Sequence, residues 1–239
     1  MKRMGTVGMV KARRRPGSLD EIHQFLPEGV GMIAVYLGVS VGTRDELAAM
    51  IPRYEQKVAL LAAQACDVMS LHAAPVFMFA GLDRETELVD AWQKRYKIPM
   101  FTAPQSQVNA LRAVGAKSFV GATYFPDSMN STYGKYFQDA GFSVLSMQGV
   151  SDVPFDQVQN LPGERIAAYI KENVKKHPKA DAIYMLGSGW HVSDIIDPLE
   201  KELGIPVVHP VAARAWEIQK RLHLHVPIPG YGRLLAELP

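Results

Sequence analysis

Two strand ends in this sequence carry residue types suited to holding a negatively charged ligand. In the first, the apolar segment 181–186 runs into Gly187-Ser188-Gly189, just before a predicted helix that begins near 192. Glycines permit a close approach to backbone N–H groups, and helix N-termini favour anions. The pattern predicts a cradle for a carboxylate or an oxyanion. The alternative is an ordinary tight turn between a strand and a helix.

The second strand end lies earlier in the chain, at His72-Ala73-Ala74-Pro75. Its small residues again permit close approach, and the N–H groups of Ala73 and Ala74 are candidate donors to a ligand. His72 is the one polar ring in an otherwise apolar strand. Its unperturbed pKa suits acid–base chemistry near neutral pH. A packed, hydrogen-bonded histidine is the alternative.

Other side chains that can move protons or pair with anions follow further strands. Tyr124 ends a predicted strand, where a phenol can donate to a developing enolate, or can be an aromatic half-buried at a sheet edge. His191 follows the glycine turn and His209 ends the last strand; either can carry a proton, or be solvated or cap a helix. Lys11 and Arg13 follow the first strand and offer an anionic substrate a charged partner, unless that loop is solvated.

Several motifs are absent, and their absence narrows the chemistry. The sequence has no phosphate-binding Gly-x-x-x-x-Gly-Lys-Ser/Thr and no Gly-x-Gly-x-x-Gly after the first strand, so nucleotide binding is not expected. It also lacks His-Glu-x-x-His, Cys-x-x-Cys and any carboxylate cluster with metal-ligand spacing. We therefore expect no metal. Cys66, the only cysteine, stands at the beginning of a strand, the wrong end for a nucleophile.

The elements that must position these residues alternate between short apolar runs and longer amphipathic stretches, which predicts an α/β fold with parallel strands. The predicted strands are 6–10, 30–37, 67–73, 99–102, 118–124, 143–147, 182–186 and 207–209. The predicted helices are 43–65, 83–96, 106–114, 130–140, 163–176, 192–203 and 212–222. The cycle appears twice, once from about 6 to 102 and again from about 118 to 209.

This repetition predicts two similar halves, residues 1–105 plus the C-terminal segment 211–239, and residues 106–210. Thr43 with Glu46 three residues later has capping-box spacing, so Thr43 should begin the long helix 43–65. That apolar helix would bury the sheet alone or also a second copy of the chain, so a homo-oligomer is compatible with the sequence.

Composition excludes several classes of protein. The 239 residues carry a formal net charge of +2 and 48% apolar residues, and the one basic run, 11–15, is local. No nucleic-acid partner is expected. No segment approaches the roughly 18 apolar residues that span a bilayer, and the N-terminus lacks a signal-peptide pattern. With one cysteine and no internal disulfide, the chain is expected to be cytoplasmic.

Short motifs spread along the chain resemble a known family. They are the segments Pro229–Leu235, Asn109–Gly115 followed by Phe119–Tyr124, and Leu203–Val208. In order and spacing these are similar to the arylmalonate decarboxylase and maleate cis-trans isomerase branch of the aspartate/glutamate racemase superfamily. The similarity extends from Gly5 to Leu235.

The resemblance implies two pseudo-symmetric Rossmann-like halves, each with a parallel four-stranded sheet, and an active site in the cleft between them. Members act on small carboxylates without a cofactor, through a carbanion or enediolate held by N–H, hydroxyl and tyrosine donors. Tyr124 matches the family's tyrosine. The donor loops correspond to Ala73, Ala74 and Pro75 in the first half and to Gly187, Ser188 and Gly189 in the second.

The chain also departs from the family pattern. The family's acid/base cysteines would fall at Ala74 or Pro75 and at Gly187, and this chain has neither. The expected function is therefore decarboxylation of a small carboxylate, with Ser188 or a histidine moving the proton. The alternatives are cis-trans isomerisation or racemisation, hydrolysis or a lyase reaction on a related carboxylate, and a carboxylate-binding module without catalysis.

Overall fold

The computed structural model describes residues 3–14, 18–150, 153 and 157–239. Its contacts divide the chain into two compact units, Met1–Ser106 with Glu217–Val226, and Gln107–Trp216 with Pro227–Pro239. Each unit contains one four-stranded sheet, and every recorded strand pair is parallel. The expected α/β class with two parallel four-stranded sheets is confirmed.

The division differs from the expected halves at the C-terminal end. The expected first half includes all of 211–239, whereas only 217–226 groups with the first unit. The last segment is held by the second unit because both oxygens of Glu200 are engaged there. Glu200 accepts the N–H of Val207 at 2.7 Å through Oε1 and the N–H of Arg233 at 2.7 Å through Oε2. Burial raises the pKa of Glu200.

The first sheet has the order β2-β1-β3-β4, and the second has the equivalent order β6-β5-β7-β8. The first unit contains β1 (Gly5–Lys11), α1 (Ser18–Gln24), β2 (Val30–Tyr36), α2 (Arg44–Ala48), α3 (Ile51–Ala62), β3 (Val68–Leu71), α4 (Ala74–Ala80), α5 (Leu82–Tyr96) and β4 (Met100–Thr102). The second contains β5 (Ser118–Thr123), α7 (Asp127–Asp139), β6 (Ser143–Gly149), the 3-10 helix η1 (Val158–Asn160), α8 (Gly163–Lys176), β7 (Ala182–Leu186), α9 (Ser193–Leu203), β8 (Val207–Val208) and α11 (Arg233–Glu237). Helices α6 (Ala103–Ala113) and α10 (Pro210–Arg221) include residues of both units.

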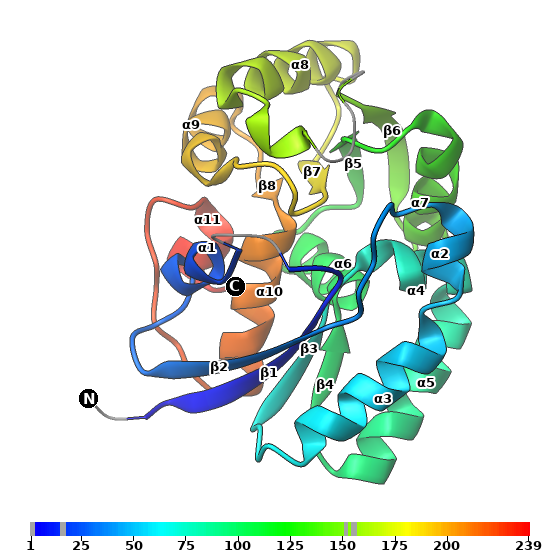
Figure 1. Cartoon of the computed structure of the whole chain (residues 1–239). Helices are drawn as coiled ribbons and strands as arrows, with labels where there is room; N and C mark the ends of the chain where they lie inside the picture. Colours follow the sequence, from blue (N-terminus) through cyan, green and yellow to red (C-terminus); the bar gives the residue numbers. More distant parts are fainter. Residues whose placement is uncertain (1–2, 15–17, 151–152, 154–156) are drawn as a thin grey trace. The chain divides into compact units, whose positions relative to one another are not determined.

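Helices cover each sheet as expected for an α/β fold. In the first unit, α3 packs on β1 and β2 and against α5, which packs on β4 (Figure 1). In the second unit, α8 and α9 pack together, with α8 on β5 and α9 on β8, while α7 packs on β6. The inner strands β3 and β7 are buried: Val68, Met69 and Leu71 of β3 and every residue of β7 are under 2% exposed. Their apolar runs are therefore the cores of the two units.

Each sheet contains an equivalent hydrogen bond at the amino-terminal ends of two neighbouring strands, β1 and β3 in the first sheet and β5 and β7 in the second. In the first unit, the Thr6 N–H donates to Asp67 Oδ2 at 2.7 Å. In the second, Asp181 Oδ2 accepts the N–H of Ser118 at 2.8 Å, the N–H of Lys117 at 3.0 Å and the Ser118 hydroxyl at 2.9 Å. An aspartate thus stands at the same place in both sheets, directly before β3 and directly before β7.

Asp181→Asn should lower the free energy of unfolding at pH 7 by about 1 kcal/mol, a figure kept small because the carboxylate is exposed. The Ser118 hydroxyl, followed by the Ser118 and Lys117 amides, lowers the pKa of Asp181. A carboxyl with a lowered folded pKa stabilises the fold above its unfolded pKa of about 4 and loses this contribution as the pH falls. Urea melts should therefore show a larger difference between wild type and variant at pH 7 than at about pH 3. Asp90→Asn, an exposed position in α5, is the control; an equal difference at both pH values would contradict the assignment.

The predicted helix 43–65 is wrong as one helix, because the structure contains α2 and α3 in its place. The expected cap is confirmed: Thr43 is the N-cap and its Oγ1 accepts the Glu46 N–H at 3.3 Å. The Glu46 carboxylate also accepts the N–H groups of residues 40, 41 and 42, at 2.5, 3.0 and 2.7 Å. Pro52 then lies in the first turn of α3, where its missing N–H is tolerated and where it ends the preceding helix.

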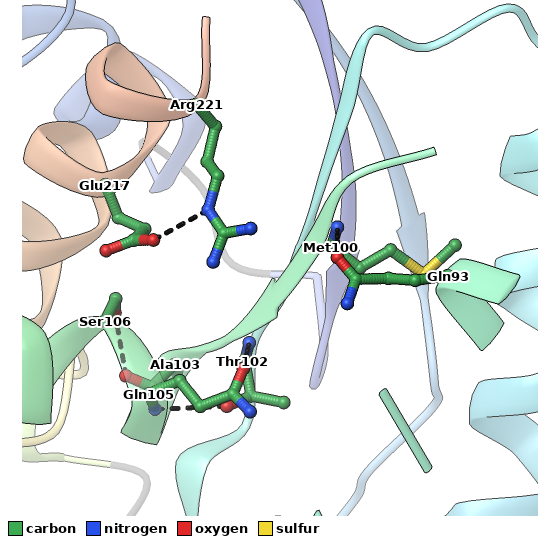
Figure 2. Close-up of polar contacts among 8 residues, drawn as sticks. All are labelled: Gln93, Met100, Thr102, Ala103, Gln105, Ser106, Glu217 and Arg221. Atoms are coloured by element: carbon green, nitrogen blue, oxygen red, sulfur yellow. Dashed lines mark hydrogen bonds and ion pairs between the residues drawn. The ribbon is translucent and has the colours of Figure 1, made fainter. Parts of the chain in front are cut away.

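Helix α6 begins three residues earlier than predicted, and a capping box explains its start. Thr102 Oγ1 accepts the Gln105 N–H at 3.1 Å, and Gln105 Oε1 accepts the Thr102 N–H at 3.2 Å (Figure 2). The Ser106 hydroxyl donates to the Ala103 carbonyl at 2.8 Å within the first turn. On the other side of β4, the Met100 N–H donates to Gln93 Oε1 at 2.8 Å. The signal Thr-x-x-Gln was present in the sequence and marks this helix start.

Candidate functional site

The hydroxyl of Tyr124 meets the glycine turn at the carboxyl ends of β5 and β7. The two strands are neighbours, and Thr123 pairs with Leu186, so Tyr124 and Gly187 each follow the last paired residue of their strand. The Gly189 N–H donates to Tyr124 Oη at 3.0 Å. The structure thus brings together four of the residues singled out from the sequence: Tyr124, Gly187, Ser188 and Gly189.

Both glycines of the turn are required by the Tyr124 ring. A Cβ on Gly187 would lie 2.2 Å from Tyr124 Cε1, and a Cβ on Gly189 would lie 2.7 Å from Tyr124 Oη. Gly187 also has φ +107, a conformation that side chains with a Cβ rarely adopt. The glycines were expected to admit a ligand to the backbone. In this structure the group that approaches so closely is the phenol of Tyr124.

The turn keeps hydrogen-bond donors that no other described residue uses. In the described part of the chain, the amides of Gly187 and Ser188 and the Ser188 hydroxyl form no hydrogen bond. Trp190 is fully buried and packs edge-on against the Tyr124 ring, with centroids 5.2 Å apart. Its indole Nε1 likewise has no partner among the described residues. The turn that contacts the Tyr124 ring therefore carries donors that the described residues leave unused.

Because a phenol has one donor and one acceptor function, the direction of its bonds matters. The Tyr124 oxygen accepts the Gly189 N–H, so the Tyr124 hydroxyl can donate only to a group other than that N–H. Donation into the oxygen polarises the O–H bond and strengthens it as a donor. Tyr124 is therefore set up as a hydrogen-bond donor at the end of the sheet.

In the first unit, the strand end at 72–75 is also strained and held from inside. Ala73 has φ 57 and ψ 60, a left-handed conformation that costs a residue with a Cβ about 1–2 kcal/mol. The buried Tyr54 hydroxyl donates to the His72 carbonyl, while the His72 N–H donates to the Val10 carbonyl at 2.8 Å. Among the described residues, the Ala73 and Ala74 amides donate to none. The expected pair of N–H donors is thus present in this unit, with Pro75 in the first turn of α4.

Tyr54 belongs to a buried polar group that sequence reasoning missed. Glu85 is 0% exposed, and the Thr102 hydroxyl donates to its Oε1. Burial, followed by the nearby charge of Glu85, raises the pKa of Tyr54 well above its usual value. Tyr54 consequently stays protonated and remains a donor to the His72 carbonyl. No sequence signal identifies this group, because Tyr54 and Glu85 read as ordinary positions of amphipathic helices.

The basic residues after β1 do not all present charges to a strand end. Lys11 is 8% exposed and its ammonium donates to the Ser18 carbonyl at 3.1 Å, at the beginning of α1. Arg13 is half-buried, Arg14 is exposed and Arg15 lies outside the described residues. Lys11 therefore has a structural role in holding α1, and Arg13 stays a candidate for pairing with an anion.

The three candidate histidines lie in different surroundings. His72 is 5% exposed, and His191 is exposed. His209 is 0% exposed, and its Nδ1 accepts the Val211 N–H at 3.4 Å in the first turn of α10. That bond places the proton of a neutral ring on Nε2. Of the alternatives considered for His209, helix capping is the one that the geometry favours.

Cys66 is placed as expected for an inert thiol. It is 6% exposed, lies two residues before β3 at the amino end of the strand, and its Sγ donates to the Leu61 carbonyl at 3.5 Å. Burial raises its pKa. A search of the described residues finds no group of three or more His, Cys, Asp or Glu placed to hold a metal ion. No helix among them is long and apolar enough to span a membrane.

Comparison with known proteins adds a family to this geometry. A family model described as arylmalonate decarboxylase matches residues 18–235. The arylmalonate decarboxylase of Bordetella bronchiseptica is 23% identical over 236 residues, covering 97% of each chain. The maleate isomerase of Nocardia farcinica (strain IFM 10152) is 27% identical over 131 residues, 54% of this chain and 51% of that protein.

Solved structures of both enzymes share the fold. A liganded double mutant of arylmalonate decarboxylase has a TM-score of 0.89 at 22% identity, covering 98% of this chain and 99% of that one. The maleate isomerase Iso from Pseudomonas putida S16 has a TM-score of 0.90 at 19% identity, with the same coverage. A mutant of the Nocardia farcinica maleate cis-trans isomerase, at a TM-score of 0.88 and 20% identity, holds a covalently bound succinylcysteine intermediate.

Proposed function

Since the chain belongs to the arylmalonate decarboxylase family, in the superfamily branch that its motifs resemble, we propose that it is a cofactor-independent decarboxylase of a small malonate-type dicarboxylate. The observation that carries the proposal is the meeting of the Tyr124 hydroxyl with the Gly187–Gly189 turn. This arrangement offers one hydroxyl donor and two unused amides at the ends of adjacent strands. Family members are decarboxylases or isomerases, so the reaction class must be tested directly.

In the proposed complex, the carboxylate that remains in the product is held by these donors. Tyr124 donates through its hydroxyl, and Gly187 and Ser188 through their amides. Hydrogen bonds to an anion are about twice as strong as bonds between neutral groups, and they strengthen as charge moves onto the carboxylate oxygens.

The proposed reaction breaks the bond between the α-carbon and the departing carboxylate. The carboxylate leaves as CO2, and its electron pair stays on the α-carbon and spreads onto the retained carboxylate as an enediolate. One proton then bonds to the α-carbon and gives the monocarboxylate. Donors that are fixed before the reaction stabilise the enediolate without reorganising, and each one typically contributes about 3–4 kcal/mol.

We assign delivery of that proton to Ser188 or His191. The single cysteine is buried at the opposite end of its strand, so a thiol is not the donor. Ser188 is a half-buried residue of the turn, and His191, three residues later, is exposed. An enediolate is strongly basic, so a hydroxyl that exchanges its proton with water is a sufficient acid. Ser188→Ala and His191→Gln, compared by kcat, separate the two.

The test is to incubate the protein with phenylmalonate, an alkylmalonate and maleate, and to follow CO2 release and product formation by NMR. Decarboxylation predicts CO2, a monocarboxylate and one solvent deuterium at the α-carbon in D2O. Conversion of maleate to fumarate alone would establish isomerisation instead. Entry of ¹⁸O from solvent water would indicate hydrolysis. Thermal stabilisation by these dicarboxylates without turnover would establish a binding module and overturn the proposal.

A further inference from the structure

A buried asparagine, Asn130, holds the two residues that flank Tyr124. Asn130 is 1% exposed and lies in the first turn of α7. Its Nδ2 donates to the Phe125 carbonyl at 3.0 Å, and its Oδ1 accepts from the Thr123 hydroxyl at 2.7 Å. Thr123 Oγ1 in turn accepts the Phe125 N–H at 3.1 Å. The backbone on both sides of Tyr124 is therefore tied to one side chain.

The Asn130 side chain also has a contact beyond residues 123–125, with the Asp127 carboxylate. Asn130 Nδ2 also donates to Asp127 Oδ1 at 3.1 Å, and that oxygen accepts the Gly149 N–H at 3.4 Å. Gly149 packs so closely that a Cβ there would lie 2.7 Å from the Phe125 carbonyl oxygen. The network links the end of β5, the start of α7 and the end of β6, so its geometry is determined by three elements.

We infer that Asn130 is a positioning residue for Tyr124: its amide sets the backbone at 123–125 and thereby aims the phenol at the Gly187–Gly189 turn. This inference rests on the proposed function for its catalytic meaning, although the placement itself is testable without any reaction. The reason is geometric. Once the flanking residues fix the Tyr124 Cα, two side-chain torsions determine where Oη lies, and the ring's contact with Gly187 leaves those torsions little freedom. A small backbone shift at Tyr124 is carried to its hydroxyl.

Asn130→Asp is the sharpest variant, since it preserves shape but replaces the donating NH2 group with an oxygen that faces the Phe125 carbonyl and the Asp127 carboxylate. Asn173→Asp is the matched control, a buried asparagine of the same unit, 3% exposed, in α8. Thr123→Val is the second variant and removes the hydroxyl that both Phe125 and Asn130 use. It keeps the inference testable if Asn130→Asp fails to fold.

The readout that needs no substrate is hydrogen exchange of the Gly189 amide, followed by NMR on ¹⁵N-labelled protein. In wild type this N–H donates to Tyr124 Oη. Asn130→Asp should speed its exchange by about 10-fold or more, as expected when a local bond opens more often. Asn173→Asp should leave it unchanged. Unchanged exchange at Gly189 in both Asn130→Asp and Thr123→Val would overturn the inference, whatever the activity of the protein.

The kinetic readout is a double-mutant cycle with Tyr124→Phe on an arylmalonate. Asn130→Asp should lower kcat by about 10–100-fold with a smaller change in KM, because a displaced donor is lost mainly from the transition state. In the Tyr124→Phe background the same change should cost less than about 2-fold, since its target hydroxyl is gone. Full additivity would show that Asn130 acts on the fold alone. Absence of turnover in wild type with faster Gly189 exchange in the variant would sink the proposed function and leave the positioning role standing.

Discussion

Tyr124→Phe should lower kcat for decarboxylation of an arylmalonate by about 10²–10³-fold, the usual effect of removing one preorganised oxyanion donor. KM should change less, because the donor binds the enediolate more strongly than the substrate's spread-out carboxylate charge. In the proposed complex, the phenol oxygen accepts the Gly189 N–H and its proton is donated to the carboxylate. Phenylalanine removes that proton while keeping the ring that packs on Gly187 and Trp190.

The measurement is steady-state CO2 release together with a urea melt of the same sample. The variant should lose about 0.5–1.5 kcal/mol of stability from the missing bond to Gly189, far too little to unfold it. Tyr169→Phe, a tyrosine of α8 in the same unit, is the control and should keep wild-type kcat. A kcat within about 3-fold of wild type for Tyr124→Phe would remove the hydroxyl from the mechanism, given the 10²–10³-fold expectation.

Gly187→Ala should destabilise the protein by about 2–4 kcal/mol, through two effects that add. A Cβ at φ +107 strains the backbone by about 1–2 kcal/mol, and the same Cβ would lie 2.2 Å from the Tyr124 ring. Relief of the second effect requires the ring to leave the turn, which would also break the bond from the Gly189 N–H. Activity should therefore fall together with stability.

Gly141→Ala is the control that measures backbone strain at positive φ without a steric clash. Gly141 has φ +93, and a Cβ there would have nothing within 4 Å, so this variant carries the strain without the contact. Urea melts should show Gly141→Ala costing about 1–2 kcal/mol and Gly187→Ala costing at least about 1 kcal/mol more. Equal losses would mean that the ring moves aside freely, and the packing of Tyr124 on the turn would then not constrain its hydroxyl.

The fold was readable from the sequence because periodicity and burial agree. The apolar run 182–186 became β7 with the same bounds, and 163–176 became α8. Helix α4 was missed because its seven residues are apolar on every side, so they carry no helical period and read as a loop after the strand. The break between α2 and α3 was missed because Pro52 was read inside one long amphipathic pattern, although a proline ends the helix before it.

Of the candidate site, only the residues at strand ends could be predicted from the sequence. Tyr124 and the Gly187–Gly189 turn could be placed together because parallel strands end at one edge of their sheet. The groups that hold them were not readable. Asn130 is one polar residue of an amphipathic helix, and its bonds to Thr123 and Phe125 depend on the turn between strand and helix. Lys11 is an example of a residue that the sequence suggested for ligand binding but that has a structural contact, because its ammonium donates to the Ser18 carbonyl.

Asp67 and Asp181 occupy equivalent positions in the two sheets, away from the strand ends that carry the candidate site. Both clamp the amino-terminal ends of the strands, whereas every candidate ligand donor lies at the carboxyl-terminal ends. In each sheet, the aspartate bonds therefore join the strands at their amino-terminal ends, and the residues proposed to bind a ligand lie at the carboxyl-terminal ends. A substitution at the carboxyl-terminal ends, whatever it costs locally, therefore leaves the aspartate bonds at the amino-terminal ends in place.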